Sequence, residues 1–556
     1  MMRPMPIGVD DFKKVRDQYY FVDKSEFIRK LIDRHSEVTL LTRPRRFGKT
    51  LLMSMLEYFF SRDKKDVSAP LFAGLAIEQA GPSYMAHRGT YPVISLTLKG
   101  IQNNSWDDMY GAFTFFMQQE FQRHAYLWQS TALTDMEKAY AERIMTGQAK
   151  PYEYQMSLWQ LSQFLQRYTQ KNVLILIDEY DAPLQAAFEF GFYDEAIQFF
   201  RLWFNNALKG NKYLDFAVLT GVLRLAKESI FSGLNNLDVC TVLTEKYADV
   251  CGFTTGDVET LLRDAGHEEK FPELKEWYNG YRVGSLDIYN PWSVIKYIDA
   301  GCRPQAYWMN TSANTILRHL LPLRDARRLT ELQGLVEGKK VRAFIQEGVS
   351  YAQVWSHTNV LYTMLLTTGY LTVAQEVPDG TGRYELQIPN KEIQTVFVRE
   401  ILDTVAQGLD GNSFYHLIDD LLSGNIEWFE QGLSRILTGL ASCYDTASGE
   451  SFYHGLMLGL TALFIGRDYT IESNRESGYG RFDIAIFPRD IWKNGVILEF
   501  KVAPEPAALV PKAREALQQI DDKHYVTAFA ERHILSVWKY GIAFCGKDVK
   551  ILGEKQ

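Results

Sequence analysis

Two separated groups of residues in this chain have the types and the spacing that chemistry on phosphate groups requires. The first group combines the stretch TRPRRFGKTLL, Thr42 to Leu52, with the stretch LILIDEYD, which ends at Asp181. The second group lies near the C-terminus, where RFDIAIF and GVILEFKV contain two carboxylates and a lysine. Lysines neutralise phosphate charge and carboxylates hold divalent cations, so both groups are candidates for reactions at phosphorus.

The stretch from Thr42 to Leu52 contains the second half of the nucleotide-binding pattern G-x-x-x-x-G-K-[ST], but Arg43 stands where the first glycine belongs. In such a loop, backbone N–H groups and a helix N-terminus bind the β-phosphate. We expect Lys49 to reach the β- and γ-phosphate oxygens and the Thr50 hydroxyl to hold Mg²⁺. Gly48 permits the close backbone approach.

Two acids follow the apolar run LILI and strengthen this interpretation. Asp178 ends a predicted buried strand, where its carboxylate could hold Mg²⁺ directly or through water. Glu179 comes next and could polarise the attacking water. Acids in this position are costly unless a metal or hydrogen bonds satisfy them, although a solvated turn after a core strand is the simpler alternative.

A further strand, residues 213–220, ends in a hydroxyl at Thr220, and Arg224 follows within reach of the same sheet edge. Thr220 could sense the γ-phosphate or align the water. Arg224 could stabilise transition-state charge in its own chain or across a subunit interface. A capping threonine and a surface arginine are equally compatible with the sequence, so both alternatives stay open.

The C-terminal group can be placed by the geometry of strands. Residues two apart on a strand share a face, so Glu499 and Lys501 project together while Phe500 points into the core. Asp483 lies on the preceding strand. Asp483 and Glu499, helped by the carbonyl of Phe500, could hold Mg²⁺, and Lys501 could position the nucleophile or neutralise charge. An ion pair between Glu499 and Lys501 is the alternative.

The elements that must position these residues indicate an α/β protein. Apolar strands at 37–42, 91–100, 172–183 and 213–220 alternate with helical stretches, which predicts a parallel sheet flanked by helices. A mostly helical middle region ends in a hairpin at 375–390, and a compact α/β pattern follows a further helical block. We predict domains at 1–240, 241–390 and 391–556.

Composition limits the functions further. A net charge of −8 argues against broad coating of nucleic acid, so any such contact needs a local basic groove. The five scattered cysteines form no C-x-x-C pair, which argues against zinc and a disulfide framework. The N-terminus lacks the apolar core of a signal peptide, and the most apolar segment, 452–466, is shorter than the ~20 residues of a membrane span. We expect a cytoplasmic protein with a buried helix at 452–466.

Several segments together resemble the AAA-ATPase-like family of bacterial proteins: DFKKVRDQYYFVDKSEFIRKLI, LLTRPRRFGKTLL, LILIDEYDAPL, TGVLRLAKESIFSGLNNL and YWMNTSANTIL. Its members typically join an N-terminal P-loop ATPase domain, through a helical lid-like or winged-helix-like region, to a C-terminal PD-(D/E)XK, restriction-endonuclease-like domain. In that family R-P-R-R-F-G-K-[ST] is the usual loop, so Arg43 is typical there. The resemblance implies ATP contacts from Arg45, Arg46, Phe47, Gly48, Lys49, Thr50, Leu51, Thr220 and Arg224. Arg45 and Arg46 would add positive charge beside the phosphates, unless structural salt bridges occupy them.

The same resemblance maps the acids and the lysine of the nuclease-like domain onto Asp483, Glu499 and Lys501. Gln519 and Tyr525 match accessory positions, and Glu450 matches an acid on the first helix of that domain. The implied cofactors are ATP and Mg²⁺, and the implied partner is nucleic acid, DNA rather than RNA.

Three hypotheses about function follow. The first is a Mg²⁺-dependent ATPase whose nucleotide state governs a metal-dependent nuclease domain, with self-assembly open because Arg224 could act across an interface. The second is a nucleotide-switched binding protein whose nuclease-like domain is catalytically silent. The third keeps the ATPase and treats the C-terminal domain as degenerate.

Overall fold

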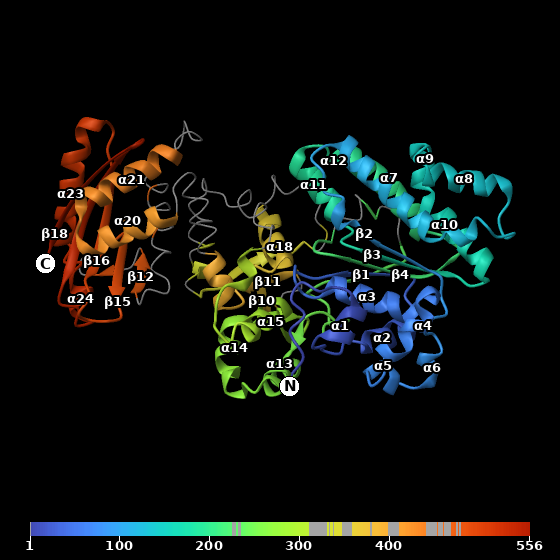
Figure 1. Ribbon diagram of the computed structural model, residues 1–556. Helices are drawn as coiled ribbons and strands as arrows, with labels where there is room; N and C mark the ends of the chain where they lie inside the picture. Colours follow the sequence, from blue (N-terminus) through green and yellow to red (C-terminus); the bar gives the residue numbers. More distant parts are fainter. Residues whose placement is uncertain are drawn as a thin grey trace. The chain divides into compact units, whose positions relative to one another are not determined.

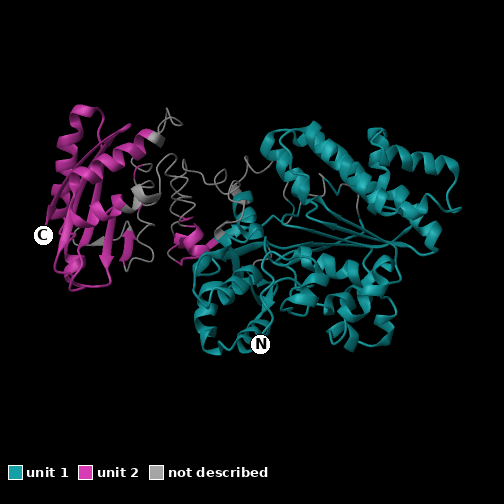
Figure 2. Ribbon diagram, viewed as in Figure 1, with its two compact units in different colours: residues 1–308, 342–392 teal, residues 309–341, 393–556 magenta. Residues whose placement is uncertain are grey.

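The chain forms two compact units, residues 1–308 with 342–392 and residues 309–341 with 393–556 (Figures 1 and 2). The computed structural model describes residues 2–224, 230–231, 235–310, 331–346 without 333 and 337, 348, 358–377, 381–397, 411–440, 453, 457, 460, 469–473, 476–477 and 480–556. Because residues 241–308 and 342–392 share a unit with the N-terminal sheet, the division at 240 and 390 stays a prediction.

The first unit is built on a five-stranded parallel sheet of order β2-β3-β4-β1-β5. Its strands are β1 (Val38–Thr42), β2 (Val93–Thr97), β3 (Val173–Asp178), β4 (Leu214–Gly221) and β5 (Leu237–Cys240). Every residue of β1 and β3 is buried, as expected of parallel strands covered on both faces. The predicted parallel sheet is therefore confirmed. β4 separates β1 from β3, and all five carboxyl ends lie at one edge.

Helices cover both faces of this sheet (Figure 1). On one side lie α1 (Phe12–Gln18), α2 (Glu26–Arg34), α3 (Lys49–Phe60), α4 (Lys65–Ser68), α5 (Ala76–Gln79) and α6 (Pro82–Met85). On the other lie α7 (Trp106–Arg123), α8 (Asp135–Met145), α9 (Pro151–Gln155), α10 (Ser157–Thr169), α11 (Ala182–Phe190) and α12 (Tyr193–Leu208). The sequence of α7 explains why this segment is a helix that packs on the sheet. Ser105 caps its first turn, and Phe113, Met117 and Phe121 repeat at helical spacing and are buried.

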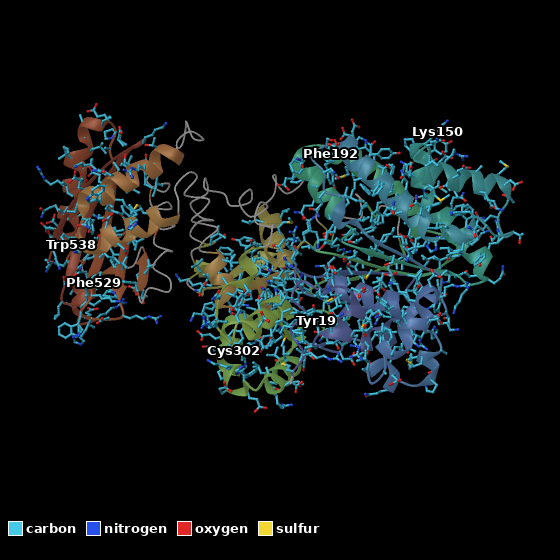
Figure 3. The ribbon with its side chains drawn as sticks, viewed as in Figure 1. Tyr19, Lys150, Phe192, Cys302, Phe529 and Trp538 are labelled. Atoms are coloured by element: carbon cyan, nitrogen blue, oxygen red, sulfur yellow. The ribbon has the colours of Figure 1, made fainter. Side chains whose placement is uncertain are left out.

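A smaller module completes the first unit beside the carboxyl edge of the sheet. It contains β6 (Phe253–Thr254), α13 (Thr255–Ala265), α14 (Phe271–Tyr278), β7 (Tyr281–Val283), β8 (Leu286–Tyr289), α15 (Pro291–Asp299), α18 (Thr358–Thr368), β10 (Thr372–Glu376) and β11 (Arg383–Gln387). β10 and β11 pair antiparallel, which confirms the predicted hairpin, and β9 (Val341–Phe344) extends their sheet. Cys302, labelled in Figure 3, belongs to the apolar core of α13, α14 and α15. Within this larger module, residues 250–308 contain α13, α14 and α15, and we call this part alone the α13–α15 module.

The second unit holds a mixed sheet of order β12-β15-β16-β17-β18, in which only β16 and β17 pair parallel. The strands are β12 (Tyr469–Ser473), β15 (Ile484–Pro488), β16 (Gly495–Val502), β17 (Val537–Cys545) and β18 (Asp548–Lys555). The helices among its described residues are α20 (Gly411–Ser423), α21 (Ile426–Leu440), α23 (Leu509–Asp522) and α24 (Thr527–Ala530). This confirms the predicted C-terminal α/β domain.

Close packing fixes α23 on this sheet. A Cβ on Gly541 of β17 would lie 2.2 Å from the carbonyl oxygen of Ala513, so only glycine allows the helix so near. Phe529, labelled in Figure 3, stacks on Phe487 in the core beside it. The consequence for the site is that Gln519, on α23, lies above β16.

Two sequence predictions touch on segments that are only partly described. The predicted helix at 452–466 lies outside the described residues except at Tyr453, Met457 and Leu460, which are helical and buried. Within the part of the chain that the structure describes, no helix has both the length and the apolar character needed to cross a bilayer.

Candidate functional site

The loop between β1 and α3 is bent by two residues with left-handed backbone. Arg46 has φ 69° and Gly48, the N-cap of α3, has φ 83°. Such a φ is uncommon for arginine, and unusual backbone of this kind concentrates at binding sites. The buried Lys49 donates from Nζ to the carbonyl oxygens of Arg43 and Pro44, each at 2.9 Å. Burial lowers the pKa of Lys49, and the Asp178 carboxylate opposes that shift. The loop thus curls around this lysine.

The side chain of Arg43 lies outside the bend. Its guanidinium is fully buried and donates to the carbonyl oxygens of Thr42 at 2.9 Å, Cys240 at 3.0 Å and Tyr247 at 2.7 Å. Arg43 is not among the residues with positive φ, so this position has no need of glycine. The arginine fastens the base of the loop to the end of β5 and does not fill the phosphate bend.

The other loop residues contact neutral groups. Arg45 donates to the side-chain oxygen of Gln185 on α11 at 3.2 Å, and the Arg46 guanidinium lies 4.3 Å from the centre of the Trp292 ring. The buried ring of Phe47 packs edge-on against Tyr281, with centroids 5.1 Å apart. Leu51 is half-buried in the first turn of α3. The guanidinium groups of Arg45 and Arg46 therefore face an amide and an indole.

The structure brings Thr50, Asp178 and Thr220 together. The Thr50 hydroxyl donates to one oxygen of the Asp178 carboxylate at 2.7 Å, and the Thr220 hydroxyl donates to the other. Asp178 is only 2% exposed. Three oxygen-bearing side chains from α3, β3 and β4 therefore meet at the carboxyl edge of the sheet, next to Lys49.

Glu179 begins the turn after β3 with a left-handed backbone, φ 52°. Burial raises the pKa of its carboxyl group, the neighbouring Asp178 raises it further, and Lys49 acts in the opposite direction. A carboxylate held in strained backbone with a raised pKa has the character of a group that accepts a proton or orients water.

Sequence reasoning assigned no role to Tyr180 or Asp181, yet both fasten this turn to the end of β4. The buried Asp181 carboxylate accepts the N–H groups of Val222 at 2.9 Å and Leu223 at 2.8 Å, and the Tyr180 hydroxyl donates to the Leu223 carbonyl at 2.6 Å. A Cβ on Gly221 would lie 2.5 Å from the Tyr180 ring. The repeated acid in D-E-Y-D, directly after a core strand, was the available signal.

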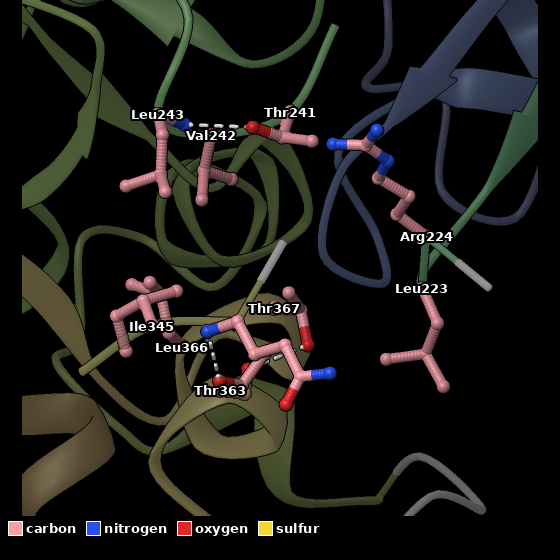
Figure 4. A pocket seen from close by; sticks show the side chains of 10 residues that line it. Leu223, Arg224, Thr241, Val242, Leu243, Ile345, Thr363, Leu366 and Thr367 are labelled. Atoms are coloured by element: carbon pink, nitrogen blue, oxygen red, sulfur yellow. Dashed lines mark hydrogen bonds between the residues drawn. The ribbon is translucent and has the colours of Figure 1, made fainter. Parts of the chain in front are cut away.

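Arg224 lies in a different place from Thr220. It lines a small pocket formed by residues after β4, residues after β5, and α18, and Figure 4 shows its guanidinium pointing toward Thr241. Neither the residues of the loop nor Asp178 line this pocket. The structure thus joins Thr220 to Asp178, whereas Arg224 lines a pocket that Asp178 does not line.

The second unit assembles the C-terminal group from β15, β16 and α23. Asp483 precedes the pair Ile484 and Leu498, so it lies beside Glu499. The Phe500 N–H donates to the Asp483 carboxylate at 2.7 Å, and the Asp483 N–H donates to the Glu499 carboxylate at 3.4 Å. Phe500 is 1% exposed, as strand alternation predicts.

Glu499 is the centre of this group. Its carboxylate is 2% exposed, accepts a hydrogen bond from the Gln519 amide, and lies 3.8 Å from the Lys501 ammonium. The Gln519 amide also lies 3.4 Å from the Tyr525 hydroxyl. Burial raises the pKa of Tyr525, and the carboxylates of Glu499 and Asp483 raise it further. Five of the six residues that the sequence singled out here are neighbours in space, and the sixth, Glu450, lies outside the described residues.

The oxygen ligands available to a metal differ between the two regions. Among the described residues, no group of three or more His, Cys, Asp and Glu side chains is arranged to hold a metal ion. The C-terminal group offers two carboxylates and the Phe500 carbonyl, and Glu450, the further acid that the resemblance implies, lies outside the described residues. The N-terminal group offers one carboxylate and two hydroxyls.

Comparison with known proteins adds two family matches. Residues 6–231 match the family described as predicted AAA-ATPase, and residues 448–554 match the PD-(D/E)XK nuclease superfamily. An uncharacterized protein in the vnfD 5'region of Azotobacter chroococcum mcd 1 is 27% identical over 560 residues, with 96% of each chain covered. The matches confirm the order of the two domains that the sequence predicts.

Proposed function

We propose that this chain, in which an AAA-ATPase-like domain precedes a PD-(D/E)XK nuclease superfamily domain, binds ATP with Mg²⁺ at residues 43–51 and hydrolyses it. The observation that carries the proposal is the 2.7 Å contact between the Thr50 hydroxyl and the Asp178 carboxylate. A hydroxyl at the start of α3 and a carboxylate at the end of β3 are hard oxygen ligands, which suit Mg²⁺. The bound ion would neutralise charge on the β- and γ-phosphates.

The loop residues have chemically distinct roles in this proposal. Lys49 exchanges the carbonyl oxygens of Arg43 and Pro44 for phosphate oxygens, which are stronger acceptors because they are charged. Gly48 leaves the N-terminus of α3 open to the phosphates. Glu179 orients the attacking water and accepts its proton, and Thr220 keeps Asp178 in place.

Two variants test these roles. We expect Lys49→Ala to weaken ATP binding, whereas Glu179→Gln should retain binding and slow hydrolysis. Lys212→Ala, an exposed lysine at the amino end of β4, serves as the matched control and should change neither. Equilibrium binding of a fluorescent ATP analogue and steady-state release of phosphate measure the two effects separately. An equal loss of binding in Lys49→Ala and Glu179→Gln would contradict the roles assigned.

For the C-terminal unit we propose a metal-dependent phosphodiesterase that acts on nucleic acid, DNA rather than RNA, under control of the nucleotide state. Asp483, Glu499 and the Phe500 carbonyl would hold Mg²⁺, and Lys501 would stabilise charge on the scissile phosphate. The adjacency of the two carboxylates supports this assignment, since Asp483 lies beside Glu499 and accepts the Phe500 N–H at 2.7 Å.

A nucleotide-switched binding protein with a silent nuclease-like domain is the second candidate. It is favoured by the bonds that Glu499 already makes to Gln519 and Lys501, which a metal would have to displace. Cleavage of plasmid DNA with Mg²⁺ that is lost in Lys501→Ala would decide for an active nuclease, and a changed rate of cleavage in Lys49→Ala would show that the nucleotide state controls it. ATP turnover unchanged by Glu499→Ala, with no cleavage of any nucleic acid, would mark the C-terminal domain as degenerate.

A further inference from the structure

The α13–α15 module touches the loop of residues 43–51 through a cation–π contact between an arginine and an indole. The Arg46 guanidinium lies 4.3 Å from the centre of the Trp292 ring, at the start of α15. Trp292 is held by one hydrogen bond at its backbone and one at its ring. Its backbone N–H donates to the Asn290 side chain at 2.9 Å, and its ring N–H donates to the Tyr307 carbonyl at 3.2 Å. Trp292 is therefore a rigid platform under a loop arginine.

The next loop residue is held by the same module. Phe47 packs edge-on against Tyr281, and its carbonyl oxygen accepts the N–H of Gly252 at 3.1 Å. Gly252 has φ 89°, and a Cβ there would lie 2.2 Å from Ile288 and 3.2 Å from Phe47. Two consecutive loop positions, Arg46 and Phe47, are thus gripped by residues more than 200 positions later in the chain.

The arginine on this platform belongs to the loop that curls around Lys49. Burial lowers the pKa of Arg46, and its neighbour Arg45 lowers it further. The Glu179 carboxylate raises this pKa, so the charges of Arg46 and Glu179 act on each other. A stacked arginine uses only the face of its guanidinium, so the N–H donors in its plane stay available for phosphate oxygens. Stacking and phosphate binding are therefore compatible in one side chain.

We propose that Trp292 is a positioning residue of the nucleotide site. It holds the Arg46 guanidinium edge-on to the phosphates, and α15 is thereby stabilised when ATP binds. The inference rests on the proposed ATP site. The contacts of Trp292 also connect the loop to the residues at which the chain leaves the first unit. Tyr307, whose carbonyl binds the Trp292 ring, precedes Trp308, whose N–H donates to the Glu392 carboxylate at 2.9 Å. The chain leaves the first unit after Trp308 and again after Glu392.

Binding of a fluorescent ATP analogue to the full chain tests this role. Trp292→Leu should weaken binding about 3- to 30-fold, the range expected for a lost cation–π contact, and Trp292→Phe should weaken it less. Trp277→Leu is the matched control, because Trp277 is also half-buried and lies 5.1 Å from Lys391, but on α14 away from the loop. It should bind like the wild type.

A double-mutant cycle separates positioning from general packing. In the Arg46→Ala background, Trp292→Leu should cause little further loss, because the partner that it positions is already gone. Arg46→Lys, which keeps the charge but lacks the planar fork, should bind as weakly as Arg46→Ala. Arg46→Lys replaces an exposed residue, so its result does not depend on the folding of the Trp292 variants.

Hydrogen exchange measures whether ATP binding affects the residues beyond Trp292. ATP should slow exchange of the amides at 307 and 308 in the wild type, and this protection should be lost in Trp292→Leu at saturating nucleotide. Additive losses in the cycle, wild-type affinity in Arg46→Lys, or unchanged exchange in the nucleotide-bound wild type would each overturn the inference alone. A wild type that binds no ATP would instead overturn the proposed function on which the inference rests.

Discussion

The two candidate sites both bury a carboxylate at a sheet, but they satisfy it with different partners. Asp178 accepts hydrogen bonds from the hydroxyls of Thr50 and Thr220, whereas Glu499 receives an amide and an ammonium. A hydroxyl oxygen can also be a metal ligand, but an amide N–H and an ammonium can only donate. A cation can therefore join the first arrangement without breaking it, and must displace partners in the second.

The backbone differs in the same direction. Arg46, Gly48 and Glu179 all have left-handed φ, which is unusual for arginine and glutamate, so two residues of the N-terminal candidate site hold uncommon backbone. Asp483, Glu499 and Lys501 are not among the positive-φ residues and belong to or adjoin regular strands. The first site is preformed by its backbone, while the second depends on which side chains occupy a regular sheet face.

Replacing the central acid of each site should give the largest contrast. We expect Asp178→Asn to reduce Mg²⁺-dependent ATP hydrolysis about 10²- to 10³-fold, because one metal ligand is lost, and Glu499→Gln to leave it unchanged. Steady-state phosphate release across a Mg²⁺ titration measures both. A comparable loss in Glu499→Gln would show that the two sites are not chemically independent.

A third buried carboxylate, that of Glu392, has only neutral groups among its hydrogen-bond partners: the backbone of Trp308 and Tyr307 and the Ser293 side chain. Burial raises the pKa of Glu392 from its usual 4.5 to about 7. The folded state then binds more protons than the unfolded state between these values, so stability falls as pH rises through them and is constant above. We expect the wild type to lose about 2.5 kcal/mol between pH 5 and 8 relative to Glu392→Gln. Urea unfolding at both pH values measures this, and parallel pH profiles would refute it.

Removing one donor from each acid should sharpen the contrast between the sites. Thr220→Val and Gln519→Leu each delete a hydrogen bond to a buried carboxylate, and each should lower the free energy of unfolding by about 2 kcal/mol. Mg²⁺ with an ATP analogue should restore much of the loss in Thr220→Val, because the ion satisfies Asp178, but not in Gln519→Leu. Thermal unfolding with and without these ligands provides the measurement, and equal rescue of both variants would remove the distinction.

The raised pKa of Glu179 predicts how ATP hydrolysis depends on pH. Because the carboxylate is the form that accepts a proton, hydrolysis should fall about tenfold per pH unit below the pKa of this group, at a pH above the usual range of glutamate. Glu179→Gln should be slow and should lack this limb. Rates measured under saturating ATP and Mg²⁺ give the profile. An identical limb in the variant would assign it to another group.

Arg224 should give the smallest effect in a single chain. Its pocket includes Thr241 but none of residues 43–51, so Arg224→Ala should slow hydrolysis less than about tenfold. A loss of about 10³-fold, together with hydrolysis that rises with protein concentration, would indicate an arginine acting across a subunit interface. Hydrolysis measured over a dilution series separates these outcomes.

Much of the framework was readable from the sequence because it depends on local pattern. β1 and β3 are buried on both faces, so they appear as unbroken apolar runs, and the β10–β11 hairpin follows from its Pro, Asp and Gly turn residues. The alternation that places Glu499 and Lys501 on one face of β16 while Phe500 enters the core is equally local. For these elements, periodicity and turn chemistry left few alternatives.

The sequence by itself thus determined the kinds of chemistry available and the elements that carry them, since residue type and spacing are properties of short segments. Only the tertiary structure decided which partner each buried polar group meets. Arg43 binds the carbonyls of Cys240 and Tyr247, and Asp181 accepts the N–H groups of Val222 and Leu223. Each partner comes from a distant segment, and a buried charge must be satisfied by whatever the folded chain brings within about 3 Å of it.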